Sequence, residues 1–238
     1  LQTSKAKNGK VVYFPSCITR TMGNSKEYRD ALTLTQITEK LINKAGYEVV
    51  YPANLKHLCC GMAFSSKGYV KAGKFLSDNL KKELAIASEN GKYPILCDMS
   101  PCTYTMKENF GKELRVYEPV EFSRKFLIPK LRVRKLNKSV AVFAVCTAKK
   151  MGVDNMLYDI ARSCARRVVI IDENCCGFAG DKGFMLPELN ENGLRNLRAQ
   201  VADCKEGYAT SRTCEIGLSN YGKITFKSIL YLIDEASN

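Results

Sequence analysis

The chain lacks the long apolar runs that membrane-spanning and secreted proteins need. No apolar stretch approaches the roughly 18 residues that a transmembrane helix requires. The first ten residues are polar and lysine-rich, without the apolar segment of a secretory signal. These absences exclude a transmembrane helix and favour a cytoplasmic location. The chain also begins without methionine, so we expect a processed product or a fragment of a longer polypeptide.

The chain also lacks the aromatic pattern of a single-strand nucleic-acid binder, although it is strongly basic. Its net charge is +13, from 37 basic and 24 acidic residues. The basic residues are spread out, and the densest run, 125–138, lies where we expect a connector. No stacking aromatics are interleaved with them. We therefore expect no nucleic-acid partner and interpret the charge as a solvated surface. Peripheral attachment to anionic lipid, on the inner face of the cytoplasmic membrane, is the better functional alternative.

Histidine is nearly absent, which removes the commonest metal ligand and proton carrier from most of the chain. The single histidine, His57, lies two residues before Cys59 and has no counterpart in the second half. We interpret it as a surface or capping residue.

Cysteine, by contrast, is abundant, and eight of the 11 cysteines form a pattern that occurs twice. Each half has a single cysteine, then an adjacent pair followed by glycine, then another single cysteine. These residues are Cys17, Cys59, Cys60 and Cys102 in the first half, and Cys146, Cys175, Cys176 and Cys214 in the second. Adjacent cysteines form only a strained disulfide, whereas both thiolates can ligate one metal centre. We therefore predict two thiolate sites for a soft metal cofactor.

Among three kinds of cysteine site, the spacing favours iron–sulfur clusters. An odd cysteine count without a secretory signal disfavours a disulfide framework. Zinc sites usually contain two close Cys-x-x-Cys pairs, and neither half has one. Four converging thiolates suit one [4Fe–4S] cluster per half. Structural zinc remains the alternative.

The secondary-structure pattern repeats together with the cysteines. The order strand, Cys, helix, strand, Cys-Cys-Gly, helix, strand, Cys, helix is expected in both halves. The predicted strands are 10–14, 47–51, 93–96, 139–145, 167–171 and 208–210, and the main predicted helices are 29–44, 69–90, 118–128, 154–165, 189–205 and 224–235.

This alternation predicts an α/β fold of two pseudo-repeated parallel-sheet units with helices on the faces. We expect one cysteine-rich repeat over residues 1–132 and a second over 133–238. The cysteines of the pattern lie past the carboxyl ends of predicted strands, and ligands bind at that edge of open α/β sheets.

Several motifs resemble a known family. They are Cys175–Leu189 (CCGFAGDKGFMLPEL), Ser211–Ser219 (SRTCEIGLS) and Asp98–Met106 (DMSPCTYTM). The chain resembles the tandem cysteine-rich CCG domain found in the B subunit of heterodisulfide reductase. It is more similar still to the C-terminal iron–sulfur region of FAD-linked D-lactate dehydrogenases.

The resemblance implies an electron-transfer module of a flavin and iron–sulfur oxidoreductase. Electrons from a 2-hydroxy acid would pass from flavin through the clusters to a quinone or cytochrome. FAD would lie on a separate domain, for which this chain has no room. That flavin domain and a ferredoxin-like domain, of the same polypeptide or complex, would be the partners of this chain. The isolated chain is therefore not expected to be active alone, and no catalytic residue is assigned.

The chain departs from the heterodisulfide reductase pattern, in which each repeat ends with Cys-x-x-Cys. Met99 and Ser211 occupy the positions three residues before Cys102 and Cys214. The resemblance therefore implies four ligands per repeat here. A thiol–disulfide reductase and a zinc-stabilised docking domain remain rival functions. Three further cysteines are interpreted as structural, and only the first is near enough to be a spare ligand: Cys97, Cys164 and Cys204.

Glycines next to the cysteine pairs are predicted to bind the cofactor. Gly61, Gly177 and Gly180 would adopt unusual φ angles and let the backbone approach a cluster closely. Their N–H groups would donate to cluster sulfurs. The segment 177–183 is glycine-rich but lacks the Gly-Lys-Ser/Thr of a phosphate loop, so we do not interpret it as one.

Overall fold

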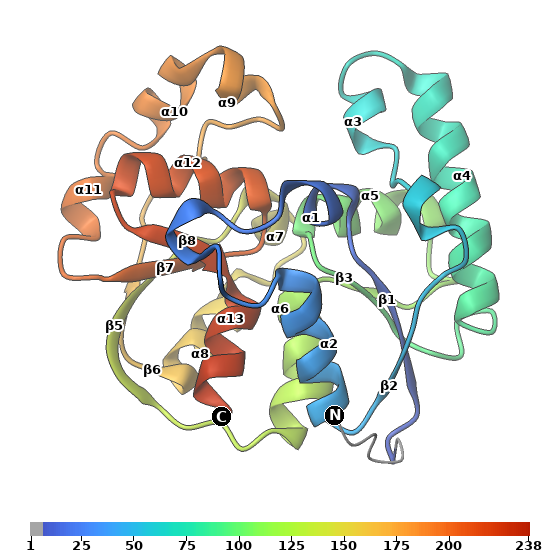
Figure 1. Cartoon of the computed structure of the whole chain (residues 1–238). Coiled ribbons are helices and arrows are strands. Elements are labelled where there is room, and N and C mark those ends of the chain that lie inside the picture. The colour runs from blue at the N-terminus through green and yellow to red at the C-terminus, as the bar shows by residue number, and fades with distance from the viewer. Residues whose placement is uncertain (1–6) are drawn as a thin grey trace. The chain divides into compact units, whose positions relative to one another are not determined.

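The computed structural model describes residues 7–238 and divides the chain into two compact units. Unit 1 is Leu1–Leu131 and unit 2 is Arg132–Asn238. Each unit is built around its own parallel four-stranded sheet (Figure 1). The two units are described separately below.

Unit 1 has its strands in the order β2-β1-β3-β4, and every neighbouring pair is parallel. Short 3-10 or π-helical turns follow several elements. The elements are β1 (Lys10–Phe14), α1 (Cys17–Met22), α2 (Leu34–Lys44), β2 (Glu48–Val50), α3 (Met62–Ser65), α4 (Val70–Ala87), β3 (Ile95–Cys97), α5 (Ser100–Phe110), β4 (Val116–Tyr117) and α6 (Pro119–Phe122).

Unit 2 repeats this arrangement with the order β6-β5-β7-β8, again wholly parallel. The elements are β5 (Leu136–Val142), α7 (Cys146–Lys150), α8 (Asp154–Cys164), β6 (Ala165–Ile170), α9 (Lys182–Met185), α10 (Pro187–Gly193), α11 (Leu197–Gln200), β7 (Glu206–Ala209), α12 (Arg212–Gly222), β8 (Thr225–Ser228) and α13 (Ile229–Ala236). β1 and β5, β2 and β6, β3 and β7, and β4 and β8 therefore correspond.

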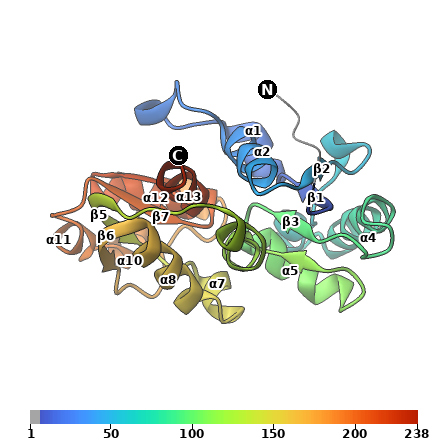
Figure 2. The same cartoon turned by 90° about the horizontal axis from the view of Figure 1, so that it is seen from below.

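The central strands form the cores because both faces of each sheet are covered. Residues 11–14 of β1 are at most 1% exposed, and so are residues 140–145, which form the end of β5 and the segment that follows it. Such continuous apolar runs are typical of parallel strands buried on both sides. α2 and α5 lie on opposite faces of the first sheet, and α8 and α12 on opposite faces of the second (Figure 2).

Local signals explain where individual helices begin. At α2, the Thr33 side chain accepts from the Gln36 backbone N–H, and the Gln36 side chain accepts from the Thr33 N–H, which is a capping box. Asn54, before the 3-10 turn Leu55–His57, and Gly61, before α3, adopt left-handed conformations.

The predicted α/β class with two parallel-sheet units is confirmed, but two strands are not predicted and two predicted helices are wrong in detail. Each sheet has a fourth strand, β4 or β8, that the sequence pattern does not predict. Residues 224–235, predicted as one helix, are β8 followed by α13. Residues 189–205, predicted as one helix, are split between α10 and α11. These short segments carry little periodicity, so partner strands and glycine positions decided their state.

The strand order creates a switch point in each unit. From the central strand β1 the chain first adds β2 on one side and then crosses to add β3 on the other. Helices leave the carboxyl ends of β1 and β3 in opposite directions, which opens a crevice there. The same crevice lies between β5 and β7. Within residues 7–238, no helix is long and apolar enough to span a membrane.

Candidate metal centres

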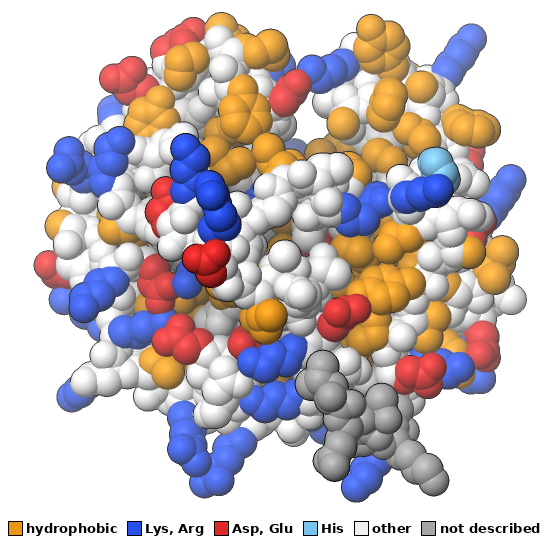
Figure 3. Space-filling view, in the orientation of Figure 1, with side chains coloured by type: hydrophobic (Ala, Val, Ile, Leu, Met, Phe, Trp, Pro, Cys, Tyr) orange, Lys and Arg blue, Asp and Glu red, His pale blue; other side chains and the backbone are white. Residues whose placement is uncertain are grey.

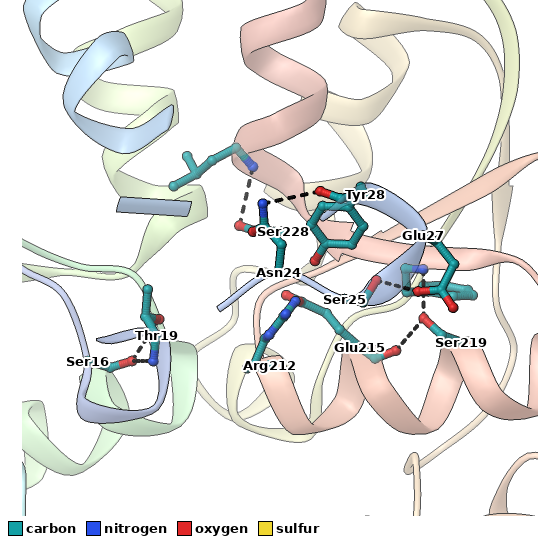
Figure 4. A network of polar contacts seen from close by, with 12 residues as sticks. Ser16, Thr19, Asn24, Ser25, Glu27, Tyr28, Arg212, Glu215, Ser219 and Ser228 are labelled. Atoms are coloured by element: carbon teal, nitrogen blue, oxygen red, sulfur yellow. Dashed lines mark hydrogen bonds and ion pairs between the residues drawn. The ribbon is translucent and has the colours of Figure 1, made fainter. Parts of the chain in front are cut away.

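The first cysteine of unit 1 begins a helix at the switch point. Ser16 caps α1 by accepting from the Thr19 N–H at 3.3 Å, and its hydroxyl also bonds the Thr19 hydroxyl (Figure 4). Asp98, directly after β3, accepts from the Ser16 N–H at 3.0 Å and from the Tyr13 hydroxyl at 2.8 Å. Burial raises the pKa of Asp98, and these donors oppose the rise. The buried carboxyl thus ties the end of β3 to the helix that carries Cys17.

The Cys-Cys-Gly loop of unit 1 is held by backbone contacts. Gly61 has a φ of +83°, and a Cβ there would lie 2.1 Å from the Gly73 carbonyl oxygen in α4. Only glycine allows this close approach. The loop N–H groups turn back toward sulfur, since Gly61 donates to the Cys59 Sγ at 3.4 Å and Met62 donates to the Cys60 Sγ.

The thiols of unit 1 form a connected cluster. Cys17 contacts Cys59, Cys59 contacts Cys60, and Cys60 contacts Cys102, each within hydrogen-bonding distance. Cys97, the last residue of β3, also contacts Cys102. All four cysteines predicted for this half are therefore adjacent, and a fifth thiol joins them. This fifth thiol, Cys97, is fully buried, and its neighbour Cys102 is also buried.

The shared hydrogen bonds divide these thiols into one thiolate and its donors. Hydrogen bonds from Cys17 and Cys60 lower the pKa of Cys59 to about 2, helped by the Gly61 N–H and the Arg20 charge. The bond to Cys59, together with burial, raises the pKa of Cys17. The bond with Cys102 acts to lower the pKa of Cys60, but the bond to Cys59 and burial outweigh it and raise this pKa to about 12. Thiolates are the metal-binding form of cysteine.

Arg20 connects the two cysteine-bearing segments of unit 1. It lies in α1, three residues after Cys17. Its guanidinium donates to the carbonyls of Leu55 at 2.5 Å, Leu58 at 2.7 Å and Pro15 at 3.2 Å. Leu58 immediately precedes Cys59, so this fork holds the α1 cysteine beside the cysteine pair.

Unit 2 repeats the loop with a smaller thiol cluster. The Cys176 Sγ lies 3.0 Å from the Cys214 Sγ, and Cys175 contacts Cys176. The bond with Cys176 raises the pKa of Cys175, with burial as the second cause. Cys146, at the start of α7, is exposed and shares no hydrogen bond with other thiols in the described part of the chain.

The supports of the second loop match those of the first. Gly177 has a φ of +70°, and a Cβ there would lie 2.2 Å from the Leu189 carbonyl oxygen. Gly177 donates to the Cys175 Sγ at 3.4 Å, and Phe178 donates to the Cys176 Sγ. In addition, the buried Asn190 amide donates to the Cys176 carbonyl at 2.6 Å.

A lysine in unit 2 corresponds to Arg20. Lys149 lies three residues after Cys146 and donates to the Glu173 carbonyl at 3.1 Å, two residues before the cysteine pair. Its charge also acts to lower the pKa of Cys175. After Cys214, Glu215 pairs with Arg212 at 3.2 Å, and its carbonyl accepts from the Ser219 hydroxyl (Figure 4).

The all-thiol donor set is of the kind that holds iron–sulfur clusters. Among residues 7–238, no three His, Cys, Asp or Glu side chains converge as one metal ion would require. Instead, the thiols of unit 1 contact one another in series, from Cys17 through the Cys59-Cys60 pair to Cys102. Sulfur ligands spread around a cluster, each receiving backbone N–H bonds, are the environment that iron–sulfur sites use. The paired N–H···S bonds of both Cys-Cys-Gly loops meet this description.

The structure adds residues to those that the sequence indicated. Cys97, Arg20 and Asp98 join the first site, although the sequence pattern does not assign them to it. Only the proximity of Cys97 to Cys102 in the sequence was a usable signal. Close contacts with α4 and α10 require glycine at positions 61 and 177. Gly180, with a φ of +79°, has no atom within 4 Å of where a Cβ would lie. A direct cofactor contact by these glycines stays a prediction.

The remaining cysteines stand apart from both clusters. The Cys164 Sγ bonds the Ser163 hydroxyl and the Cys204 Sγ bonds the Ser139 hydroxyl, each at 3.7 Å. His57 is exposed at the end of a 3-10 turn.

Comparison with known proteins connects this geometry to a family. Residues 11–107 match the family model of the cysteine-rich domain, CCG. The chain is 25% identical over 142 residues to the C subunit of anaerobic glycerol-3-phosphate dehydrogenase from Escherichia coli strain K12, and equally to that of strain O157:H7. Each match covers 54% of this chain and 36% of the relative.

The chain thus spans about a third of the length of the curated relatives it matches. By name, the relatives are subunits of a dehydrogenase. The matched residues contain Cys17, the Cys59-Cys60 pair and Cys102, which is the connected thiol cluster of unit 1. Residues 11–107 are therefore similar in sequence to the cysteine-rich CCG domain.

Proposed function

We propose that the chain is an iron–sulfur electron-transfer module of a flavin-linked dehydrogenase. Each unit would hold one [4Fe–4S] cluster, with Cys17, Cys59, Cys60 and Cys102 as the ligands in unit 1. The ligands in unit 2 would be Cys146, Cys175, Cys176 and Cys214. Residues 133–238 would accordingly be a second CCG repeat. The flavin domain would lie elsewhere in the same polypeptide or complex.

The observation that carries this proposal is the matching pair of Cys-Cys-Gly loops at the two switch points. In each loop, two successive backbone N–H groups donate to the two cysteine sulfurs. Such bonds stabilise negative charge on sulfur and thereby influence reduction potential. The corresponding order of the strands supports a duplicated site.

The residues of the chain would bind, shield and tune the cofactor. When bound, an iron–sulfur cluster accepts and donates single electrons. Burial of Cys60, Cys102, Cys176 and Cys214 would exclude water from part of each site. Arg20 and Lys149 would hold the first-cysteine helices beside the cysteine pairs and place positive charge near the sulfurs.

The substrate of the complete enzyme is proposed to be D-lactate or a related 2-hydroxy acid. This rests on the similarity of the Cys175–Leu189 and Ser211–Ser219 motifs to D-lactate dehydrogenases. The relatives found by comparison are named for glycerol 3-phosphate, so that substrate is the competing assignment. A quinone or cytochrome would be the final acceptor. Assay of the complete polypeptide or complex with both substrates distinguishes them.

The metal content of the chain tests the module itself. Anaerobically purified protein should contain about eight irons and eight sulfides, with an EPR signal that changes on reduction by dithionite. About four irons would mean that one unit holds a cluster. Stoichiometric zinc without iron would contradict the proposal and favour a zinc-stabilised docking domain. Turnover of a disulfide substrate with a dithiol donor would favour a thiol–disulfide reductase.

A further inference from the structure

The surface next to the first Cys-Cys-Gly loop exposes large apolar side chains. Phe64 of α3 is 43% exposed, Tyr69 and Val70 at the start of α4 are each 65% exposed, and Phe75 is 73% exposed. Apolar side chains gather over α3 and α4 with lysines among and around them (Figure 3). We call α3 and the first two turns of α4 the α3–α4 face. Exposed apolar groups on this scale indicate an interaction surface.

The charge of this face has one sign. Residues 49–77 contain no aspartate or glutamate. They contain four lysines, all of which are exposed: Lys56, Lys67, Lys71 and Lys74. The first carboxylate after them, Asp78, is paired with Lys74 at 2.8 Å. The face therefore presents an apolar centre with a basic rim.

The corresponding surface of unit 2 has the apolar component, but its charge is mainly acidic. Four large apolar residues of α9 and α10 and their connection are exposed: Phe184, Met185, Leu186 and Leu189. Three acidic residues and one lysine accompany them along the chain, at Asp181, Glu188, Glu191 and Lys182. The concentration of positive charge is thus particular to unit 1, and does not follow from the repeated fold.

The α3–α4 face is directly joined to the cysteine pair. α3 begins two residues after Cys60, and Gly73 of α4 packs on the Gly61 backbone with no room for a Cβ. A partner on this face would lie next to the loop that carries two of the proposed cluster ligands. The position suits exchange of electrons between a docked protein and the first site.

We propose that the α3–α4 face docks an acidic one-electron carrier protein. This inference rests on the proposed iron–sulfur function and specifies its partner. The docked pair would exchange one electron, so that one cofactor is oxidised and the other reduced, with no bond made or broken. Interfaces of electron-transfer partners are small, and complementary charge brings the two proteins together. A basic rim around an apolar centre is complementary to an acidic patch of this kind.

The arrangement of the face favours a protein over a lipid surface. A helix that lies in a membrane interface has an apolar stripe along its length. In α4 the exposed large apolar residues are Val70 and Phe75 in the first turns and Ile86 in the last turn. Between Val70 and Ile86 the exposed surface carries the Lys74–Asp78 pair and Lys82. Charged residues therefore interrupt any apolar stripe along α4, and the apolar area beside the cysteine loop is compact, as in a protein contact.

The test uses a small acidic flavodoxin as the probe and needs no loaded cluster. A carbodiimide couples lysines directly to carboxylates that they touch, and mass spectrometry locates the coupled residues. We expect the links at low salt to concentrate on Lys67, Lys71 and Lys74 and to disappear at high salt. Links distributed over all exposed lysines of the chain would overturn the proposal.

Matched charge reversals make the test specific to this face. Lys67→Glu with Lys71→Glu should weaken flavodoxin binding by roughly tenfold. Arg198→Glu with Lys205→Glu changes the net charge equally at exposed positions of unit 2 and should have little effect. Equal loss in both double variants would show only an effect of net charge and would contradict the proposal. Phe75→Ser should weaken binding at all salt concentrations, because it removes apolar contact.

Two further measurements separate the remaining outcomes. Vesicles of phosphatidylcholine and phosphatidylglycerol should bind wild type and Phe75→Ser equally, and a selective loss in the variant would assign the face to lipid. Iron analysis of the same preparations tests the cluster independently. Localised cross-links without iron would contradict the iron–sulfur function and retain the docking face, whereas iron without localised links would contradict the docking face alone.

Discussion

The two units share a backbone plan and differ in the side chains at its switch point. Both have the same parallel strand order and a glycine that packs on the following helix. Unit 1 connects five thiols, whereas three are in contact in unit 2. The last residue of β3 is Cys97, and the last residue of β7 is Ala209. Repetition of the fold therefore repeats the loop but does not dictate the full sulfur set.

The basic residue after the first cysteine differs in the same way. Arg20 donates to three carbonyls in unit 1, and Lys149 donates to one in unit 2. Cys17 is half-buried beside its partners, whereas Cys146 is exposed. The comparison indicates that the first site is the more preorganised of the two.

Removing one member of each cysteine pair should have the largest effect. Cys60→Ala and Cys176→Ala should each remove about half of the bound iron, because each affects one cluster. Iron and sulfide analysis after anaerobic purification measures this. In the wild-type protein we expect brief exposure to air to remove the cluster of unit 2 first, since two of its proposed ligands are exposed.

Cys164→Ala is the matched control, because Cys164 bonds only a neighbouring serine. Loss of all iron in Cys60→Ala would show that the two sites do not fill independently and would contradict the comparison.

The loop glycines should tolerate alanine least among the glycines with positive φ. Gly61→Ala and Gly177→Ala would place a methyl group 2.1 and 2.2 Å from carbonyl oxygens. We expect each to lower the free energy of unfolding by at least about 3 kcal/mol. Gly68→Ala and Gly180→Ala, with positive φ but no nearby atoms, should cost about 1 kcal/mol. Urea unfolding measures all four variants, and equal costs for the crowded pair and the uncrowded pair would exclude the close contact as the cause.

The residues that cap the last helix of each unit should contribute differently to the pH dependence of the free energy of unfolding. Glu118 caps α6 in unit 1 and is fully buried, which raises its pKa to about 7. The folded state therefore holds this proton more tightly than the unfolded chain does. The free energy of unfolding should fall by roughly 2–3 kcal/mol as the pH rises from about 4.5 through 7.

Glu118→Gln should remove this part of the pH dependence, as measured by urea unfolding over the same pH range. In unit 2, Ser228 caps α13 by accepting from the Leu230 N–H. Ser228→Ala should lower stability by about 1 kcal/mol at every pH. A wild-type curve that matches Glu118→Gln at all pH values would refute the assignment.

Substitution of the two basic residues, Arg20 and Lys149, should lower stability by different but smaller amounts. Arg20→Gln should cost about 2 kcal/mol of stability, because a half-buried charged donor loses three carbonyl partners. Lys149→Gln should cost about 0.5 kcal/mol, since its single bond is exposed. Arg20→Gln should also shift one reduction potential to a more negative value, measured by redox titration.

Arg20→Lys retains the charge but not the fork. This variant should therefore have a reduction potential close to that of the wild type, while remaining less stable than the wild type. Recovery of stability without recovery of the potential would contradict the role of the charge.

The sequence by itself determined the duplicated α/β plan. β-branched apolar runs such as 10–14 and 139–145 specify buried strands through local composition, and Cys-Cys-Gly marks the loops. Placement of the cysteines past strand ends also followed from chain order. Short strands such as β8 could not be predicted, because a four-residue strand exists only through its neighbour, here β7.

Tertiary structure alone decided which thiols touch and what holds them. Cys97 reaches Cys102 because β3 and α5 bring their ends together, and Arg20 reaches Leu58 across 38 residues of chain. The need for glycine at 61 arises from the carbonyl of Gly73, which belongs to another element. These contacts depend on where loops return in space. Local propensity does not encode such a path, because packing between distant segments selects it.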